Sequence, residues 1–156
     1  MACGASNKIP SQTRKRQTIM DHYDFFVFSL DDQLFAFDVN RVGRVVRAMQ
    51  LTQLPEGPEL VQGIIDIRGE TLPVFNIRKR FHLPARTIAL DDRIVIVNGQ
   101  RQMAFIADTV VGVLSLVPEQ YQSPSQLYPG LERYLAGVGK HRQQTILIFD
   151  IKVLDN

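Results

Sequence analysis

The chain has 156 residues, a formal net charge of +2 and a hydrophobic fraction of 45%, values that are ordinary for a globular protein. This length is sufficient to bury a core in one domain or in two closely packed halves. No apolar stretch approaches the roughly 20 residues that span a bilayer, and the single cysteine, Cys3, cannot form an internal disulfide. We therefore expect a soluble cytoplasmic protein, and these features argue against a membrane-spanning or disulfide-stabilised one.

The charge is distributed unevenly along the chain. Residues 1–20 contain four basic residues and no acid, whereas the remainder contains 14 basic and 16 acidic residues, a net charge of −2. A polar, aperiodic and basic segment is typical of a disordered tail, and attraction to nucleic acid or to a membrane is the alternative. We expect a disordered tail over 1–20 and a folded domain over 21–156, with approximate halves at 21–88 and 89–156.

After the tail, the pattern is that of short strands. YDFFVFSL at 23–30 and QLFAFDV at 33–39 are aromatic and apolar, and the two aspartates between them favour a turn. RVGRVVRAM at 41–49 continues as an extended run. The following loop is indicated by Pro55, Gly57 and Pro58, which exclude regular strand pairing.

The stretch GIIDIRGETLPVFNIRKRF, at 63–81, predicts a hairpin. Its apolar residues form two strands, the second of which includes Ile77, and Gly69–Glu70 suits a two-residue turn between them. Apolar residues on both faces suggest a small closed barrel with one face against a neighbour. Pro73 cannot donate a backbone hydrogen bond, so we expect it at a sheet edge or at a barrel corner.

The second half repeats this style. DDRIVIVNG, RQMAFIAD, VVGVLSLVP and QTILIFDI predict four further strands, separated by turn residues and by a long polar connection that contains three prolines. Strands at this spacing indicate an all-β protein made of two small barrels or one sandwich.

The residue pattern contains no convincing catalytic or metal-binding constellation. The three histidines are far apart, and the aspartate pairs at 31–32 and 91–92 lie beside predicted turns, where aspartate is a turn former. AGVGKH at 136–141 lacks the first glycine and the final Ser/Thr of a phosphate loop, so Gly137 and Gly139 indicate a bulge or a close backbone approach. We therefore expect no enzymatic activity, no cofactor and no metal, and protein–protein interaction becomes the default role.

Several segments together resemble the CheW family of bacterial chemotaxis coupling proteins, over essentially all of residues 21–156. They appear in the family's order and spacing as DFFVFSLDDQLFAFDV, VGRV, PELVQGIIDIRGETLPVFNIRKRF, IADTVVGVL and YLAGVGKHRQQTILIFDIKVLD. The resemblance implies two small five-stranded SH3-like barrels packed on a shared hydrophobic core. It also implies a non-enzymatic adaptor that couples the regulatory domain of a CheA-type histidine kinase to the cytoplasmic tips of methyl-accepting chemoreceptors. Contact with the membrane would then be indirect, through the receptors.

The resemblance also indicates where partners would bind. For the first barrel's partner surface we expect a set of residues around the 63–81 hairpin and the preceding strand, namely Val42, Arg44, Gly63, Arg68 and Gly69. For a groove between the barrels that would hold a receptor helix, the candidates are Ile94, Val95, Val110 and Val113. Burial in the core is the alternative for these four aliphatic residues, and bonding of local carbonyls is the alternative for Arg68.

One position departs from the family. Where the family usually has glutamate in a "VxEV" segment, this chain has Arg44, so an acid–base pair with Arg68 is not available. Two like charges in proximity require an acid between them, and Asp66 or Glu70 could be that acid. Our hypothesis is that the partner surface has a different charge pattern, suited to a distinct kinase or receptor set. A small-barrel nucleic-acid-binding protein that uses the basic arm is the alternative function, and a steep salt dependence would favour it.

Overall fold

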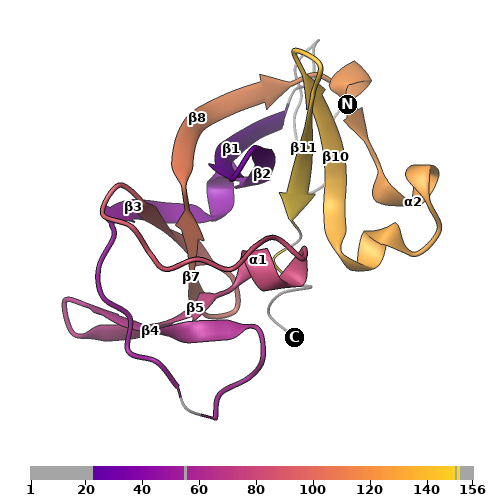
Figure 1. Ribbon diagram of the computed structural model, residues 1–156. Coiled ribbons are helices and arrows are strands. Elements are labelled where there is room, and N and C mark those ends of the chain that lie inside the picture. The colour runs from indigo at the N-terminus through magenta and orange to yellow at the C-terminus, as the bar shows by residue number, and fades with distance from the viewer. Residues whose placement is uncertain (1–22, 55, 150, 152–156) are drawn as a thin grey trace.

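The computed structural model describes residues 23–54, 56–149 and 151, most of which lie in two β-sheets (Figure 1). One sheet has the strand order β8-β1-β2-β11-β10-β9, and the other has the order β3-β6-β7-β5-β4. Each sheet forms a small SH3-like barrel, and we call them the six-stranded and the five-stranded barrel. The predicted all-β fold of two small barrels is confirmed. The sixth strand of the larger sheet is β9, which has only two residues.

The strands of the two barrels do not follow the expected halves of the chain. The five-stranded barrel is continuous in sequence, whereas the six-stranded barrel combines the first two strands with the last four, so the sheets divide the chain differently from 21–88 and 89–156. The predicted tail at 1–20 lies outside the described residues. The six-stranded barrel contains β1 (Tyr23–Leu30), β2 (Gln33–Asp38), β8 (Thr109–Leu116), β9 (Tyr121–Gln122), β10 (Leu135–His141) and β11 (Gln144–Phe149). The five-stranded barrel contains β3 (Val42–Arg47), β4 (Val61–Ile67), β5 (Glu70–Phe75), β6 (Arg93–Asn98) and β7 (Gln102–Ala107).

Short helical turns connect these strands. In Figure 1, α1 lies between the six-stranded barrel above and strands β4 and β5 below, and α2 lies to the side of β10. The helices are α1 (Ile77–Arg80) and α2 (Pro124–Leu127), and the 3-10 turns are Val39–Arg41, Pro118–Gln120 and Leu131–Arg133.

A shared core explains why several strands are apolar on both faces. In β1, Phe26 and Phe28 pack into a cluster common to both barrels, whereas Phe25 and Val27 pack into a second cluster inside the six-stranded barrel. Strand β6 alternates in the same way between the shared cluster and the interior of the five-stranded barrel. Because each fully buried phenylalanine contributes about 2–3 kcal/mol, this aromatic seam holds the barrels together. Its largest members are Phe28, Phe35, Phe37, Phe105 and Phe149.

The turn of the β4–β5 hairpin lies one residue earlier than predicted. Ile67 pairs with Glu70, so the two turn residues are Arg68 and Gly69, and both have positive φ (53° and 88°). This is the backbone of a type I′ turn, which matches the twist of the flanking strands. The sequence interpretation placed glycine first in the turn, but glycine here occupies the second position and arginine occupies the first.

Pro73 lies inside the sheet and not at a sheet edge, which was one of its two predicted positions, the other being a barrel corner. Strand β5 is flanked by β4 and β7, and Pro73 stands opposite Ile64. The backbone N–H and C=O of Ile64 are bonded to Thr52 on its other side, so this pair exchanges no hydrogen bond. On the other side of β5, the pairing with β7 involves Val74 and Phe75. The missing proline N–H is therefore tolerated because no ladder bond requires it.

Two elements differ from the predicted strands. Ile77 does not extend β5 but begins α1, where the Asn76 side chain accepts a hydrogen bond from Lys79 N–H and so caps the helix. Residues 135–141 form strand β10, and a Cβ on its Gly137 would overlap the Tyr121 ring. The predicted close backbone approach at this glycine is confirmed, although the strand itself was not predicted.

Candidate partner-binding site

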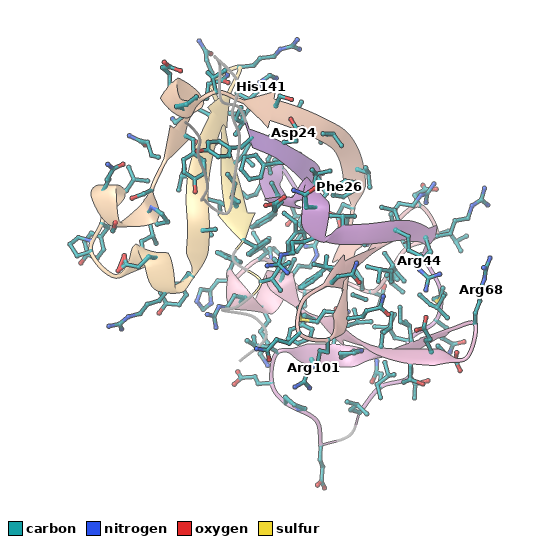
Figure 2. All side chains as sticks on the ribbon, turned by 180° about the vertical axis from the view of Figure 1, so that it is seen from behind. Asp24, Phe26, Arg44, Arg68, Arg101 and His141 are labelled. Atoms are coloured by element: carbon teal, nitrogen blue, oxygen red, sulfur yellow. The ribbon has the colours of Figure 1, made fainter. Side chains whose placement is uncertain are left out.

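Two arginines lie at one end of the five-stranded barrel. Arg44 of β3 and Arg68 of the β4–β5 turn lie on the same side of the molecule in Figure 2, far from His141 at the opposite end. Arg44 Nη2 lies 3.4 Å from Glu70 Oε1, so of the two acids considered, Glu70 is the one that pairs with Arg44. Asp66 serves differently, because its Oδ1 accepts the Gly69 N–H at 2.9 Å and fixes the turn.

Arg68 itself is exposed at the tip of the turn. It makes no hydrogen bond or ion pair with any residue of the described ranges, which argues against the alternative that it bonds local carbonyls. Gly69 is exposed beside it, and its φ of 88° suits a residue without a Cβ. Val42 is half-buried against the shared core. Four of the five residues expected at this surface are therefore at least partly exposed to a partner. They are Val42, Arg44, Arg68 and Gly69.

Gly63, the fifth residue, is buried and does not belong to the surface. A Cβ at this position would lie 2.8 Å from the carbonyl oxygen of Thr52 and 3.3 Å from the Leu51 side chain. Glycine therefore lets the 51–52 segment pair closely with β4. Its role is packing, and the expectation of partner contact was wrong for this residue.

The four groove candidates separate into two pairs. Ile94 and Val95 are both fully buried, Ile94 inside the five-stranded barrel and Val95 in the shared core, so the structure corrects their assignment to a groove. Core burial, the alternative, holds for them because both faces of β6 are covered. On β8, Val110 is half-buried and Val113 is 56% exposed. These two valines remain candidates for partner contact.

The edge strands expose further apolar residues that the sequence analysis did not select. Strand β8 is one edge of the six-stranded sheet, and its Val111 is 49% exposed next to a bulge at Gly112, whose φ is 121°. Strand β3 is an edge of the other sheet and exposes Val45 at 37%. The alternation of apolar and polar residues within VVGVLSLV and VGRVV could have indicated these exposed valines. The β-bulges shift the strand register, however, and so change which residues face outward.

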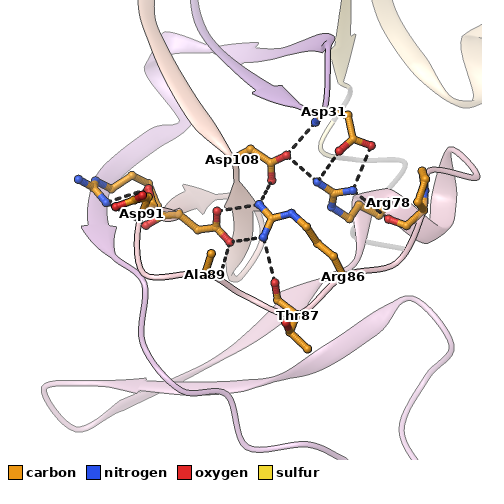
Figure 3. A network of polar contacts seen from close by, with 10 residues as sticks. Asp31, Arg78, Arg86, Thr87, Ala89, Asp91 and Asp108 are labelled. Carbon is orange, nitrogen blue, oxygen red and sulfur yellow. Dashed lines mark hydrogen bonds and ion pairs between the residues drawn. The ribbon is translucent and has the colours of Figure 1, made fainter.

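A charged cluster joins the barrels at their junction (Figure 3). Arg78 of α1 binds both carboxylate oxygens of Asp31, in the β1–β2 turn, at 3.2 Å. The same guanidinium donates to Asp108 Oδ2 at 2.6 Å and to the Pro84 carbonyl at 2.9 Å. Asp108 lies between β7 and β8, where the chain passes from one barrel to the other, and its Oδ2 also accepts the Asp31 N–H. Arg78 thus ties both barrels to α1.

A second arginine extends this cluster into the connection before β6. Arg86 binds Asp92 through two hydrogen bonds of 2.7 and 3.0 Å and also donates to Asp108 Oδ1. Asp92 is 2% exposed, and its Oδ2 accepts the Ala89 N–H as well. We call Asp31, Arg78, Arg86, Asp92 and Asp108 the junction clamp. Because its anions are held by guanidinium forks and backbone N–H groups, the clamp suits structural fixation.

The pKa shifts of the clamp residues agree with a structural role. Partial burial alone would raise the pKa of Asp108, but the hydrogen bonds from the Asp31 N–H, Arg78 and Arg86 outweigh it and lower that pKa below its usual value. The hydrogen bond to Asp92 is the main cause of a raised pKa of Arg86. Burial works against the charge of Arg78, yet its bonds to Asp108 and Asp31 leave its pKa raised as well. All three groups are therefore charged at neutral pH.

The clamp was not predicted from the sequence. The aspartate pairs at 31–32 and 91–92 lie at turns, as expected, but no local pattern links Asp31 to Arg78, which is 47 residues away. Within the described residues, no group of three His, Cys, Asp or Glu side chains is arranged to hold a metal ion. No helix in the described part of the chain is both long and apolar enough to cross a membrane.

Comparison with known proteins identifies the family. The model of the CheW-like domain matches residues 24–155. The chain belongs to the CheW family. Among its CheW-family relatives, the chemotaxis protein CheW of Treponema pallidum is 29% identical over 140 residues, which cover 86% of this chain and 82% of the relative. The protein FrzA of Myxococcus xanthus is 32% identical over 91 residues, which cover 58% and 57% of the two chains.

The same relationship is visible in three dimensions. The crystal structure of the scaffolding protein TtCheW from Thermoanaerobacter tengcongensis superimposes with a TM-score of 0.72 at 30% sequence identity. The superposition covers 82% of this chain and 88% of TtCheW. The CheW fold therefore extends over both barrels.

Proposed function

We propose that this protein is a non-enzymatic adaptor of the cytoplasm that joins a CheA-type histidine kinase to methyl-accepting chemoreceptors. It binds the regulatory domain of the kinase and the cytoplasmic tips of the receptors, and it needs no cofactor. The observation that carries this proposal is the CheW-like domain over residues 24–155, with a two-barrel fold like that of a scaffolding protein.

The proposed kinase surface is the exposed end of the five-stranded barrel. It comprises Val42, Arg44, Arg68 and Gly69, of which Arg68 has no partner among the described residues and stands on a turn fixed by Asp66. Arginine suits such a place because its fork bonds carboxylates and carbonyls, while its stem covers apolar surface.

The proposed receptor surface is β8 of the six-stranded barrel, around Val110 and Val113. An edge strand that exposes valines presents an apolar strip of the kind that a helix can cover. The two surfaces belong to different barrels, so two partners can bind at once. That geometry is what an adaptor requires.

Isothermal titration calorimetry against the regulatory domain of each chemotaxis-type kinase of the source organism tests the kinase arm. We expect one domain to bind with a Kd of about 1 μM, typical of a transient interface, and Arg68→Ala to weaken it about tenfold. The matched control is Arg142→Ala, because Arg142 is also exposed at positive φ in a hairpin turn, but in the other barrel. It should bind as the unaltered chain does.

A receptor-tip fragment tests the second arm. Val113→Glu should abolish binding of the fragment and leave kinase binding unchanged, because it places a charge on the β8 strip. Thr109→Glu, on the same strand, is the control for charge alone, since Thr109 is exposed but polar. A folded protein that binds neither partner in either assay would contradict the adaptor function.

A further inference from the structure

The end of the five-stranded barrel holds Arg44 in a loose pair. Arg44 lies on the same face of β3 as Val46, which packs against the barrel's interior cluster, so its side chain emerges at the barrel's end. There it meets Glu70 at 3.4 Å, with 36% and 61% of the two side chains exposed. An exposed pair at this distance adds little to stability, and a competing carboxylate can replace it.

Arg68 is positioned beside this pair without a carboxylate of its own. The Asp66 carboxylate already accepts the Gly69 N–H, so it is committed to the turn. Arg68 makes no hydrogen bond or ion pair with a described residue, and it is exposed on a turn in which both Arg68 and Gly69 have positive φ. Its five N–H donors are therefore held on a defined turn but unused within the described part of the chain.

Cations exceed anions along the adjoining edge. Strand β3 and the turn before it contain Arg41, Arg44 and Arg47, and no acid occurs between residues 39 and 50. Arg47 stands directly opposite Arg93 of β6, an arrangement that is unfavourable for folding. The fold alone therefore does not explain an arginine at position 47.

We propose that this end binds an acidic segment of a partner protein, whose carboxylates bridge Arg44 and Arg68 and replace Glu70. Guanidinium groups bind carboxylates through two parallel hydrogen bonds. Two guanidinium groups, one on a fixed turn and one on an edge strand, therefore select a negatively charged segment and also fix its orientation. This inference rests on the proposed function and gives the chemistry of its kinase-side surface.

Charge reversal tests the inference with the kinase regulatory domain as the probe. At roughly 50 mM NaCl, where screening is weak, Arg68→Glu should weaken binding at least about tenfold and Arg44→Glu about fivefold. Glu70→Gln should strengthen it about twofold, because Arg44 is released from its internal pair. Arg142→Glu, at the equivalent turn position of the other barrel, is the matched control and should have no effect. Replacing an acid by lysine on the partner should restore binding to Arg68→Glu.

The outcomes separate this inference from the adaptor function. If the kinase domain binds the unaltered chain, and Arg44→Glu and Arg68→Glu bind equally well, the acidic-partner inference is overturned and the adaptor function stands. If the unaltered chain binds no kinase domain, the kinase arm of the function fails, and a second probe decides the inference.

That probe is a hexaglutamate peptide added to the ¹⁵N-labelled full chain, with hexaglutamine as control. We expect the Nε–H signals of Arg44 and Arg68 to shift more than that of Arg142. Equal shifts at all three arginines would overturn the inference. Tighter binding of a single-stranded DNA oligonucleotide to the same arginines would also overturn it, in favour of a nucleic-acid ligand.

Discussion

Arginine meets carboxylate in two regions of this molecule, and the surroundings give the contacts different roles. In the junction clamp, Arg78 and Asp108 are 11% and 17% exposed in their side chains and lie 2.6 Å apart. At the end of the five-stranded barrel, Arg44 and Glu70 are 36% and 61% exposed and lie 3.4 Å apart. The same pair of functional groups therefore fixes the barrels in one place and leaves a guanidinium available in the other.

The difference follows from the free-energy cost of removing one partner of each ion pair. In the clamp, removal of one member leaves its partners poorly solvated and without their bonds, which is strongly unfavourable. At the barrel end, water replaces a lost partner at almost no free-energy cost. A contact that stabilises the fold is thus a poor switch for recognition, and a contact that contributes little to stability is a good one.

The largest expected effect comes from breaking the clamp at its centre. Arg78→Ala should lower the free energy of unfolding by about 3 kcal/mol, because Asp31 and Asp108 lose their shared cation. Urea denaturation followed by circular dichroism measures this change. Lys79→Ala, on the same helix, removes only an exposed contact of 3.4 Å to Glu59 and should change stability by less than about 0.5 kcal/mol. Equal losses for both variants would show that the clamp does not have this role.

The contribution of Asp108 to stability should depend on pH. Its pKa is lowered in the folded protein, so its contribution to stability is present above the ordinary aspartate pKa, about 3.9, and is lost as the pH falls through the folded value. At pH 7, Asp108→Asn should lower the free energy of unfolding by about 2 kcal/mol. The difference from the unaltered chain should shrink as the pH falls from about 5 to about 2. A difference that stays constant over this range would contradict the clamp's electrostatic role.

Backbone geometry at the barrel end gives a smaller effect. Gly69→Ala should lower the free energy of unfolding by about 1 kcal/mol, because a residue with a Cβ is strained at a φ of 88°. The added Cβ would contact nothing within 4 Å, so the loss reports backbone strain and not a steric clash. The equivalent turn of the other barrel carries Gln143 at φ 67°, so Gln143→Gly should be neutral or mildly stabilising. Thermal unfolding of both variants compares the two turns directly, and a stabilising Gly69→Ala would be incompatible with this turn geometry.

The smallest effect on stability is expected where the effect on binding is large. Arg44→Ala should change the free energy of unfolding by less than about 0.5 kcal/mol, since its pair with Glu70 is exposed. The same variant should weaken kinase binding measured by calorimetry. A loss of stability comparable with that of Arg78→Ala would mean that the barrel end is structural after all.

The pattern of apolar and polar residues along the chain predicted much of this fold, because it indicates which faces of a strand are buried. Apolar residues on both faces of the 63–81 stretch indicated a barrel face covered by a neighbour. The structure confirms this in β5, where Val74 packs inside the five-stranded barrel and Phe75 packs against the shared core. The same two-sidedness explains the error at Ile94 and Val95, since a strand buried on both faces looks identical to one that lines a groove.

Other features depend on tertiary contacts that a single sequence does not display. The β4–β5 turn differs from its prediction by one residue, because a type I′ turn accepts Arg68 at positive φ when Gly69 and the Asp66 carboxylate hold it. The clamp assembles residues between 31 and 108, and no periodicity links them. Glu70 was identified only as one of two possible acids, and the distance to Arg44 decides between them.

The central claim is that one chain holds a kinase and a receptor at the same time. The most direct test mixes the full chain with the kinase regulatory domain and a receptor-tip fragment, and measures the mass of the complex by size-exclusion chromatography with light scattering. The expected result is a single complex that contains all three components, and that loses only the kinase domain with Arg68→Glu and only the receptor fragment with Val113→Glu. Two partners that displace each other, or a folded chain that elutes alone, would contradict the account.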